Sequence, residues 1–354
     1  MSRRGLVALV VVSVAGGAGA SAAPPERSVA ELVGRRLVVA MEGTTPSAAL
    51  LGRIRRGEVA GVLLFGGNVR SPTQLRALTS TLQGAARDGG RPPLLIMADQ
   101  EGGVVRRLRW APPRAPAREL GRLADDAIRE VGRRTGVALA RAGITVDLAP
   151  VADVPAVRGA FIAAAGRAFS PSPGRVGDAA TAFSLGLRDA GIAATLKHFP
   201  GLGRAVVSTD AARVTIDATR AQLDRGVVPF ATAVRAGAAR LVMLSSASYP
   251  AYGVGGSAAW SPAILARLRD LGFDGVTITD ALEPLARSHG RALDQAALLC
   301  ARAGVDLLLF AGNEASTDRV YRSLVAAAVA GRLPRAGLDA SAGRVEALAR
   351  ELGG

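Results

Sequence analysis

The sequence is poor in the residue types that most often bind metals or form disulfides. It has one cysteine, two histidines and one lysine, the last among 44 basic residues in 354. Cys300 cannot form a disulfide within the chain, and we expect it to be a small buried side chain in a helix. The sequence lacks cysteine and histidine spacings of a zinc site, a phosphate-binding glycine loop and a G-x-S-x-G turn. An oxygen-ligated Mg²⁺ would have no motif either, so we expect neither a metal nor a cofactor.

Aromatic residues are also scarce, at 4% of the chain, although hydrophobic residues make up 49%. A large core is therefore possible, but it must be built from alanine, valine and leucine. No run of 18 or more apolar residues occurs in the body of the chain, so no transmembrane span is indicated in the mature protein.

The first residues have the features of an export signal. Arg3 and Arg4 precede an apolar stretch at 6–15, and residues 20–22 read ASA, a small-residue cleavage site. We interpret residues 1–22 as a cleavable signal peptide of the general or the twin-arginine type, and expect a secreted or cell-envelope protein. An uncleaved anchor is disfavoured by the short apolar part, and no cysteine is present there to carry a lipid. Residues 23–36 are interpreted as a lead-in segment and 37–354 as one domain.

Acidic residues are fewer than basic ones, and the net charge is +15. Such a charge suits an anionic neighbour, such as nucleic acid, a membrane surface or an acidic cell-wall polymer. The arginines are scattered through helical stretches, however, and form no basic stripe with aromatic residues. We therefore expect no specific nucleic-acid partner, while attraction to an anionic cell wall fits the charge. The sequence does not indicate an oligomeric state.

Eight short apolar runs alternate with helical stretches along the chain. Continuous apolar runs are typical of strands buried on both faces. The expected strands are 37–40, 61–65, 94–98, 144–148, 192–196, 241–245, 276–279 and 305–310. The expected helices are 46–56, 73–87, 125–142, 175–190, 220–236, 262–271, 294–303 and 315–331, with a final helix at 338–352. This order predicts an α/β fold, a (β/α)8 TIM-type barrel. An open doubly wound sheet is the alternative, but residues 42–46 do not form its phosphate turn.

Polar residues collect just after the ends of the expected strands, which is where barrel enzymes place their sites. Lys197, the single lysine, and His198 end the fifth strand, and Asp280 ends the seventh. The other polar residues expected at this end are Asp99, Arg107, Asp147, Asp153 and Arg167. A lone aspartate before a helix could be only a helix cap. Carboxylates together with lysine, histidine and arginine instead suit a polyhydroxylated ligand, and a carboxylate can also attack an anomeric carbon.

Three segments resemble the signatures of glycoside hydrolase family 3, closest to its single-domain β-N-acetylglucosaminidase branch. Residues 99–107 read DQEGGVVRR, residues 197–201 read KHFPG, and residues 278–280 read ITD. The resemblance implies a barrel of the (β/α)8 type and a retaining mechanism with Asp280 as the nucleophile. It also implies that five residues hold the sugar: Asp99, Arg107, Arg167, Lys197 and His198.

The sequence departs from that family pattern at the proton donor. Leu202 stands where the branch usually has histidine, and Ser208, Thr209 and Asp210 stand where an Asp-Ser-His turn usually supplies the acid/base histidine. Since retaining hydrolysis needs a proton donor and then a base, Asp210 is the nearest replacement. It would need a pKa raised by burial or by the charge of the nucleophile; otherwise it is a solvated loop residue.

Two functions from different classes follow. The first is a secreted retaining exo-glycosidase acting on β-linked N-acetylglucosamine or a related β-glycoside, with cell-wall glycans such as peptidoglycan fragments as substrates. The second is a carbohydrate- or cell-wall-binding protein that keeps the sugar pocket without efficient turnover. The nucleophile segment favours the first, and the missing histidine favours the second.

Overall fold

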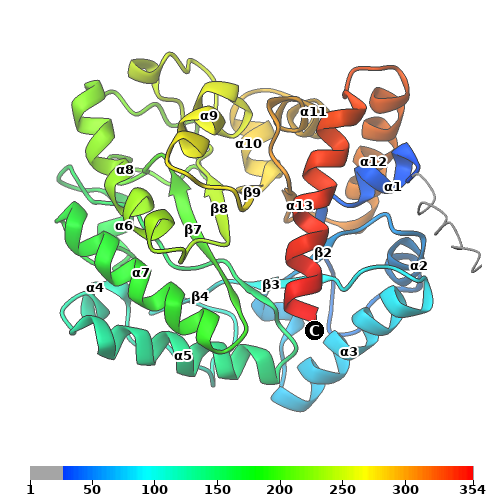
Figure 1. Ribbon diagram of the computed structural model, residues 1–354, viewed down its shortest axis with the longest axis horizontal. Coiled ribbons are helices and arrows are strands. Elements are labelled where there is room, and N and C mark those ends of the chain that lie inside the picture. Colours follow the sequence, from blue (N-terminus) through cyan, green and yellow to red (C-terminus); the bar gives the residue numbers. More distant parts are fainter. Residues whose placement is uncertain (1–26, 354) are drawn as a thin grey trace, which may run out of the picture.

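The computed structural model describes residues 27–353, which form a barrel of parallel strands surrounded by helices (Figure 1). The strands of the barrel are β1 (Leu37–Ala40), β2 (Gly61–Leu64), β3 (Leu95–Ala98), β6 (Val146–Asp147), β7 (Ala193–Phe199), β8 (Leu241–Leu244), β9 (Val276–Thr279) and β10 (Leu308–Phe310). The predicted signal peptide, residues 1–22, lies outside the described residues.

The eight strands follow one another around the barrel in the order β10-β1-β2-β3-β6-β7-β8-β9. Each neighbouring pair in this order is parallel. The first and last strands of the order meet through a parallel bridge between Ile278 and Leu307, where the Thr279 N–H donates to the Leu307 carbonyl at 3.0 Å. The predicted (β/α)8 barrel is therefore confirmed, and the alternative of an open doubly wound sheet is wrong.

Alternate residues of each strand point into the barrel, because side chains change face at every position. The inward residues form a compact inner core that contains no aromatic side chain deep in the barrel. Its strand members are Val38, Leu63, Leu95, Met97, Val146, Ala193, Leu241, Met243, Val276, Ile278 and Leu309. Continuing the alternation by two positions from Met97 and from Ile278 leads to Asp99 and Asp280. Lys197 likewise lies four positions after Ala193, so the strands themselves direct these polar side chains to the mouth of the barrel.

Helices cover the outside of the barrel and pack on the outward strand residues. The longer ones are α2 (Ala48–Arg56), α3 (Pro72–Asp88), α5 (Asp125–Arg141), α7 (Pro173–Asp189), α8 (Arg220–Arg235), α9 (Pro262–Asp270), α11 (Leu293–Ala303), α12 (Glu314–Val329) and α13 (Arg335–Gly353). Among the described residues no helix is long and apolar enough to cross a bilayer.

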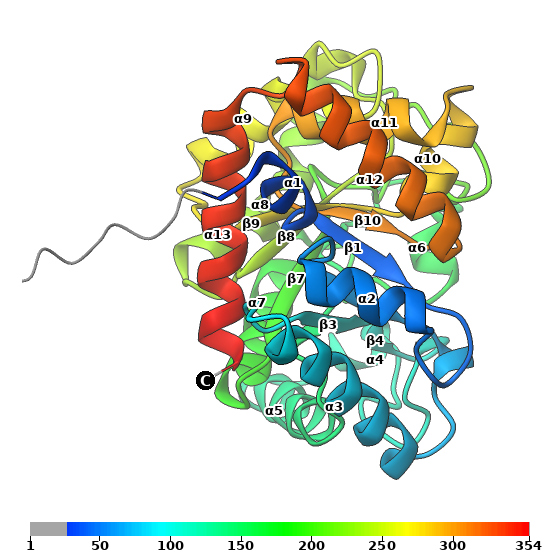
Figure 2. The ribbon, with the colours of Figure 1, turned by 90° about the vertical axis from the view of Figure 1, so that its right-hand side faces the viewer.

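The last helix, α13, closes the end of the barrel at which the strands begin. Val345, Leu348 and Ala349 belong to the same hydrophobic cluster as the inward strand residues. Figure 2 shows α13 across the starts of the strands, with α6 (Phe161–Ala164) and α10 (Leu282–Ser288) at the opposite end. One end of the barrel is thus sealed by apolar side chains, and the other is left for the polar residues.

The sequence-based boundaries need five corrections. Strand β7 runs through Phe199, so Lys197 and His198 lie inside the strand and do not follow it. Strand β6 is shorter than expected, although the Leu148 N–H still donates to the Ala98 carbonyl and continues the pairing. The lead-in contains a helix, α1 (Val29–Gly34), whose Ser28 and Glu31 form a capping box that the sequence displays. Residues expected as a loop after β3 form a hairpin of β4 (Gln100–Gly102) and β5 (Val105–Arg106), and α10 was not expected.

Candidate active site

Lys197 lies at the floor of the barrel mouth between two carboxylates. Its Nζ is 2.8 Å from Oδ1 of Asp99 and 2.7 Å from Oε1 of Glu101. Only 2% of Lys197 is exposed, so its charge is shielded from water. An ammonium group carries three N–H donors, and two of them are directed to these carboxylates. The third remains for a ligand in the mouth.

Two arginines extend the network on either side. Arg107 donates through Nη2 to Oδ2 of Asp99 at 2.8 Å, and its guanidinium lies over the ring of Phe65 at the end of β2. Arg167 forms two parallel hydrogen bonds to Glu101, both of 2.7 Å. Such a paired contact fixes the orientation of the guanidinium plane as well as its position. The two acids and three bases therefore form one connected charge cluster.

The cluster keeps its members charged despite their burial. Burial by itself would raise the pKa of both carboxyl groups. The charges of Lys197 and Arg107 outweigh burial at Asp99 and lower its pKa. The charges of Lys197 and Arg167 do the same at Glu101. Burial would lower the pKa of Lys197, and the two carboxylates raise it instead. The floor of the mouth is consequently ionised at neutral pH and rich in fixed hydrogen-bonding groups.

His198 is positioned by a buried aspartate of the loop after β6. Its Nδ1 is 2.7 Å from Oδ2 of Asp153, whose Oδ1 accepts the backbone N–H groups of His198 and Leu202. Because a carboxylate only accepts hydrogen bonds, Nδ1 carries the hydrogen and Nε2 is left for a ligand. The register between β7 and β8 shifts at His198, which is a bulge that interrupts the side-chain alternation next to Lys197.

Asp280 follows the last residue of β9 and is partly exposed at the mouth. Its Oδ1 accepts the N–H of Ala281 at 2.8 Å. Ala281, and not Asp280, occupies the cap position of α10, and no side chain caps this helix. The interpretation of Asp280 as only a helix cap is therefore wrong.

Asp210 lies on the exposed 204–213 loop that follows the KHFPG turn. The protein around its carboxyl group raises its pKa by desolvation, and the negative charge of Asp280 raises it further, while the charge of His198 opposes both. Asp210 is therefore within electrostatic reach of Asp280 and His198, at the same mouth. The loop is held there by Arg287 of α10, whose Nη2 donates to the Asp210 carbonyl at 3.0 Å.

The chain matches known proteins over most of its length. Residues 28–348 match the model of the glycosyl hydrolase family 3 N-terminal domain. The chain belongs to glycoside hydrolase family 3. It is therefore a glycoside hydrolase, as the sequence resemblance predicted.

Individual relatives agree with this family assignment. A β-hexosaminidase of Thiobacillus denitrificans is 35% identical over 282 residues, which is 75% of each chain. A secreted glycosyl hydrolase of Arthroderma benhamiae is 34% identical over 331 residues, which is 90% of this chain and 92% of that protein. The crystal structure of a β-N-acetylhexosaminidase from Beutenbergia cavernae superposes with a TM-score of 0.84 at 33% identity, over 92% of this chain and 99% of that one.

The predicted site residues of this family 3 glycoside hydrolase therefore meet at one end of the barrel. Asp99, Arg107 and Lys197 are joined by direct contacts, Arg167 joins them through Glu101, and the charges of His198 and Asp280 act on Asp210. Sequence reasoning gave no role to Glu101, although it lies inside the DQEGG segment two positions after Asp99. It also missed the pairing of Asp153 with His198, because nothing in the spacing of the two residues indicates a contact between separate loops.

Asp147 is a further buried acid near the mouth, but none of the described residues pairs a cation with its carboxyl group. Its Oδ1 accepts the Gln100 N–H at 2.9 Å, and within the described part of the chain its Oδ2 has no hydrogen-bond partner. Burial raises the pKa of Asp147 to about 8, and the bond from Gln100 offsets part of the shift. A neutral carboxyl group at this place supports the start of the β4–β5 hairpin without adding a charge to the cluster.

The remaining histidine of the glycoside hydrolase does not join the site. His289 lies at the end of α10 opposite to Asp280, where its ring packs edge-on against Trp260 at 4.8 Å between centroids. Its Nδ1 is 3.1 Å from the Leu285 carbonyl. A histidine acid/base is thus not supplied from this part of the chain.

Proposed function

We propose that the protein is a retaining exo-glycosidase that hydrolyses β-linked N-acetylglucosamine or a related β-glycoside, with Asp280 as the nucleophile and Asp210 as the acid/base. One observation carries the proposal: Asp280 and the electrostatically coupled Asp210 share a mouth whose floor is the charge cluster around Lys197. The β-hexosaminidase relative from Thiobacillus denitrificans and the β-N-acetylhexosaminidase from Beutenbergia cavernae support the choice of sugar.

In the first step, a carboxylate oxygen of Asp280 attacks the anomeric carbon as the bond to the leaving oxygen breaks. The protonated carboxyl group of Asp210 gives its proton to that oxygen, so the aglycone leaves as a neutral alcohol. A raised pKa serves this step, because more of Asp210 is then protonated near neutral pH. In the second step, Asp210 takes a proton from water, whose oxygen attacks the anomeric carbon and releases Asp280.

The floor of the mouth would hold the sugar ring in place for both steps. Lys197 has one N–H not directed at a carboxylate, His198 offers Nε2, and Asp99 can accept from a hydroxyl group. Because Asp99 and Lys197 already neutralise each other, these groups act as fixed dipoles rather than free charges. Such preorganised groups reorient little during the reaction, and this lowers the barrier.

The test uses an aryl β-N-acetylglucosaminide and an aryl β-glucoside with the mature protein and its Asp280→Asn variant. An aryl leaving group needs little protonation, so the wild-type protein should release it whatever the strength of Asp210 as an acid. We expect the variant to lose about 10³-fold or more in kcat. Release by the wild-type protein no faster than by Asp280→Asn would refute the enzymatic function and favour a sugar-binding protein.

We further propose that residues 1–22 direct export and that cell-wall glycans, including peptidoglycan fragments, are the natural substrates. The secreted relative from Arthroderma benhamiae and the net charge of +15 support an extracytoplasmic enzyme near an anionic polymer. Cell fractionation of the native host tests the location, and release of N-acetylglucosamine from wall fragments tests the substrate. Cytoplasmic retention of the full-length chain would contradict the export proposal.

A further inference from the structure

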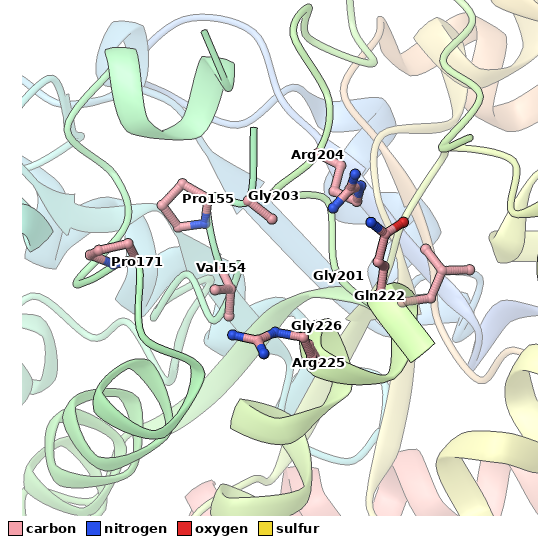
Figure 3. A pocket seen from close by; sticks show the side chains of 11 residues that line it. Val154, Pro155, Pro171, Gly201, Gly203, Arg204, Gln222, Arg225 and Gly226 are labelled. Atoms are coloured by element: carbon pink, nitrogen blue, oxygen red, sulfur yellow. The ribbon is translucent and has the colours of Figure 1, made fainter. Parts of the chain in front are cut away.

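A cavity of about 380 Å³ opens beside the KHFPG turn, and its lining includes none of the candidate site residues. Its lining comes from the loop after β6, the loop before α7, the KHFPG turn and the first part of α8 (Figure 3). Val154, Pro155, Pro171 and Leu223 form apolar walls. The size is within the range of cavities that bind small molecules.

Two arginines and a glutamine supply the polar side chains of this cavity. Figure 3 shows Arg204 and Arg225 on two sides of it, with the Gln222 amide beside Arg204. Among residues 27–353 neither guanidinium makes a hydrogen bond or an ion pair. None of the residues lining the cavity is acidic. The two positive charges therefore face a common space without compensation from the protein.

The acidic residues nearest in sequence are already engaged elsewhere. Asp153, beside Val154, is bound by His198 and by two backbone N–H groups. Asp224, beside Arg225, accepts from the Tyr252 hydroxyl at 2.7 Å and pairs with Arg267. Rearrangement of either acid towards the cavity would break these contacts. The positive charge of the cavity is thus a stable property of the fold.

The backbone leaves this space open and fixes its shape. A side chain at Gly203 would place its first carbon 1.8 Å from the Val154 carbonyl oxygen, so only glycine fits there. The close approach lets the Ala156 N–H donate to the Gly203 carbonyl at 3.0 Å. The turn that follows Lys197 and His198 therefore also forms one wall of the cavity.

We propose that this cavity binds a small organic oxyanion, in which a carboxylate pairs with Arg204 and Arg225 and a short apolar body lies against Val154, Pro155 and Leu223. Guanidinium groups bind carboxylate and phosphate with the same two-pronged geometry. The apolar walls select an organic acid over inorganic phosphate. This binding site lies outside the catalytic mouth and does not depend on the proposed reaction.

A bound oxyanion would add a contact between the 204–213 loop and α8. Arg204 begins the 204–213 loop that carries Asp210, whereas Arg225 belongs to α8. An anion held by both would tie the base of the loop to the helix. Occupancy should therefore slow hydrogen exchange of the backbone amides of the loop.

The binding test is calorimetric titration of the wild-type protein with succinate, inorganic phosphate and succinamide, the neutral counterpart of succinate. We expect succinate to bind more tightly than phosphate, and succinamide not to bind. Arg204→Gln and Arg225→Gln should each weaken succinate binding by about ten-fold or more, because each removes a charge-assisted pair. Arg235→Gln, at the other end of α8, removes the same charge from a position outside the cavity and should leave binding unchanged.

Equal weakening by all three variants would show a general charge effect and overturn the proposal, as would no succinate binding at millimolar concentration. Tighter binding of phosphate than of succinate would overturn the choice of an organic acid. Hydrogen exchange supplies an independent measurement. Succinate should protect the loop amides in the wild-type protein but not in Arg225→Gln, and equal protection in both would contradict the bridge between loop and helix.

Discussion

The floor of the mouth and the 204–213 loop are built in opposite ways. At the floor, Lys197 and Glu101 are buried, Asp99 is mostly buried, and every charge has a partner within hydrogen-bonding distance. On the loop, the side chain of Asp210 is exposed, and the loop is fixed mainly by backbone contacts such as that from Arg287. A residue in a closed charge cluster cannot change type without leaving a buried charge unpaired. A residue on an exposed loop can change at little cost in stability.

This difference explains how the site can depart from the family pattern at one place and keep it at another. The charged groups expected to hold the sugar are paired with one another, so replacing one residue would leave the charge of its partner unpaired. Asp210, the proposed proton donor, lies on the loop outside this cluster, so an aspartate can stand where the family branch usually has histidine. Five predictions test this contrast, three at or beside the floor and two on the loop.

The largest effect is expected from Lys197→Met, which removes the positive charge between Asp99 and Glu101. The carboxylates of Asp99 and Glu101 would then repel each other with no cation between them. Arg107 and Arg167 would each still neutralise one carboxylate, but neither lies between the two. We expect a loss of about 3–5 kcal/mol in the free energy of unfolding, measured by chemical denaturation. The exposed Arg235→Gln serves as the matched control and should change stability by less than about 0.5 kcal/mol.

Lys197→Arg refines this prediction, because it keeps the charge but changes its shape. A planar guanidinium does not replace a compact ammonium between two fixed carboxylates. We expect the variant to remain folded and to raise KM for the sugar substrate. Unchanged kinetics would mean that Lys197 does not contact the sugar.

On the loop, Asp210→Asn should affect the reaction and hardly affect stability. If Asp210 donates the proton, its loss lowers kcat by about 10²-fold or more for alkyl glycosides, whose leaving groups need protonation. Aryl glycosides with good leaving groups should be affected far less in the glycosylation step. Equal losses for both substrate types would contradict the acid role. Because its pKa is raised, the acidic form of Asp210 should also persist to higher pH than that of an ordinary aspartate.

A smaller effect is expected from Arg287→Gln, which removes the hydrogen bond to the Asp210 carbonyl but leaves both carboxylates of the site in place. The loop should become more mobile, and kcat should fall by up to about ten-fold, the equivalent of one hydrogen bond. The loss should again be larger for alkyl than for aryl glycosides, which separates a positioning role from general destabilisation. Arg291→Gln, an exposed arginine just after α10, is the control.

The last prediction concerns the pH dependence of stability and the neutral acid Asp147. Its pKa is raised in the folded state to about 8, above the usual value of an unfolded aspartate. The folded protein therefore holds a proton that the unfolded chain has lost, and stability decreases as pH rises from about 4 towards 8. The slope for one proton is at most about 1.4 kcal/mol per pH unit. Asp147→Asn should remove this slope, and an unchanged profile would show that Asp147 is ionised.

Much of this architecture could be predicted because it follows from local patterns. Apolar runs with helical stretches between them indicated the barrel, and the ends of strands gave Asp99, Lys197 and Asp280. Asp210 was found by counting from the KHFPG segment. The partners of these residues could not be predicted in the same way. Glu101 is brought to Lys197 by a short hairpin, and Asp153 reaches His198 from a different loop, so both contacts depend on the assembled fold.

The seal formed by α13 has a consequence for the order in which the chain becomes stable. The 19 residues of this helix are the last element of the chain, yet Val345, Leu348 and Ala349 complete the cluster that fills the barrel. During synthesis all eight strands therefore leave the ribosome before α13, whose apolar side chains cover the end of the barrel at which the strands begin. A chain truncated at residue 334 keeps every residue of the candidate site. Its inner core would be exposed to water at the end that α13 covers, so the barrel should not be stable enough to hold the site together.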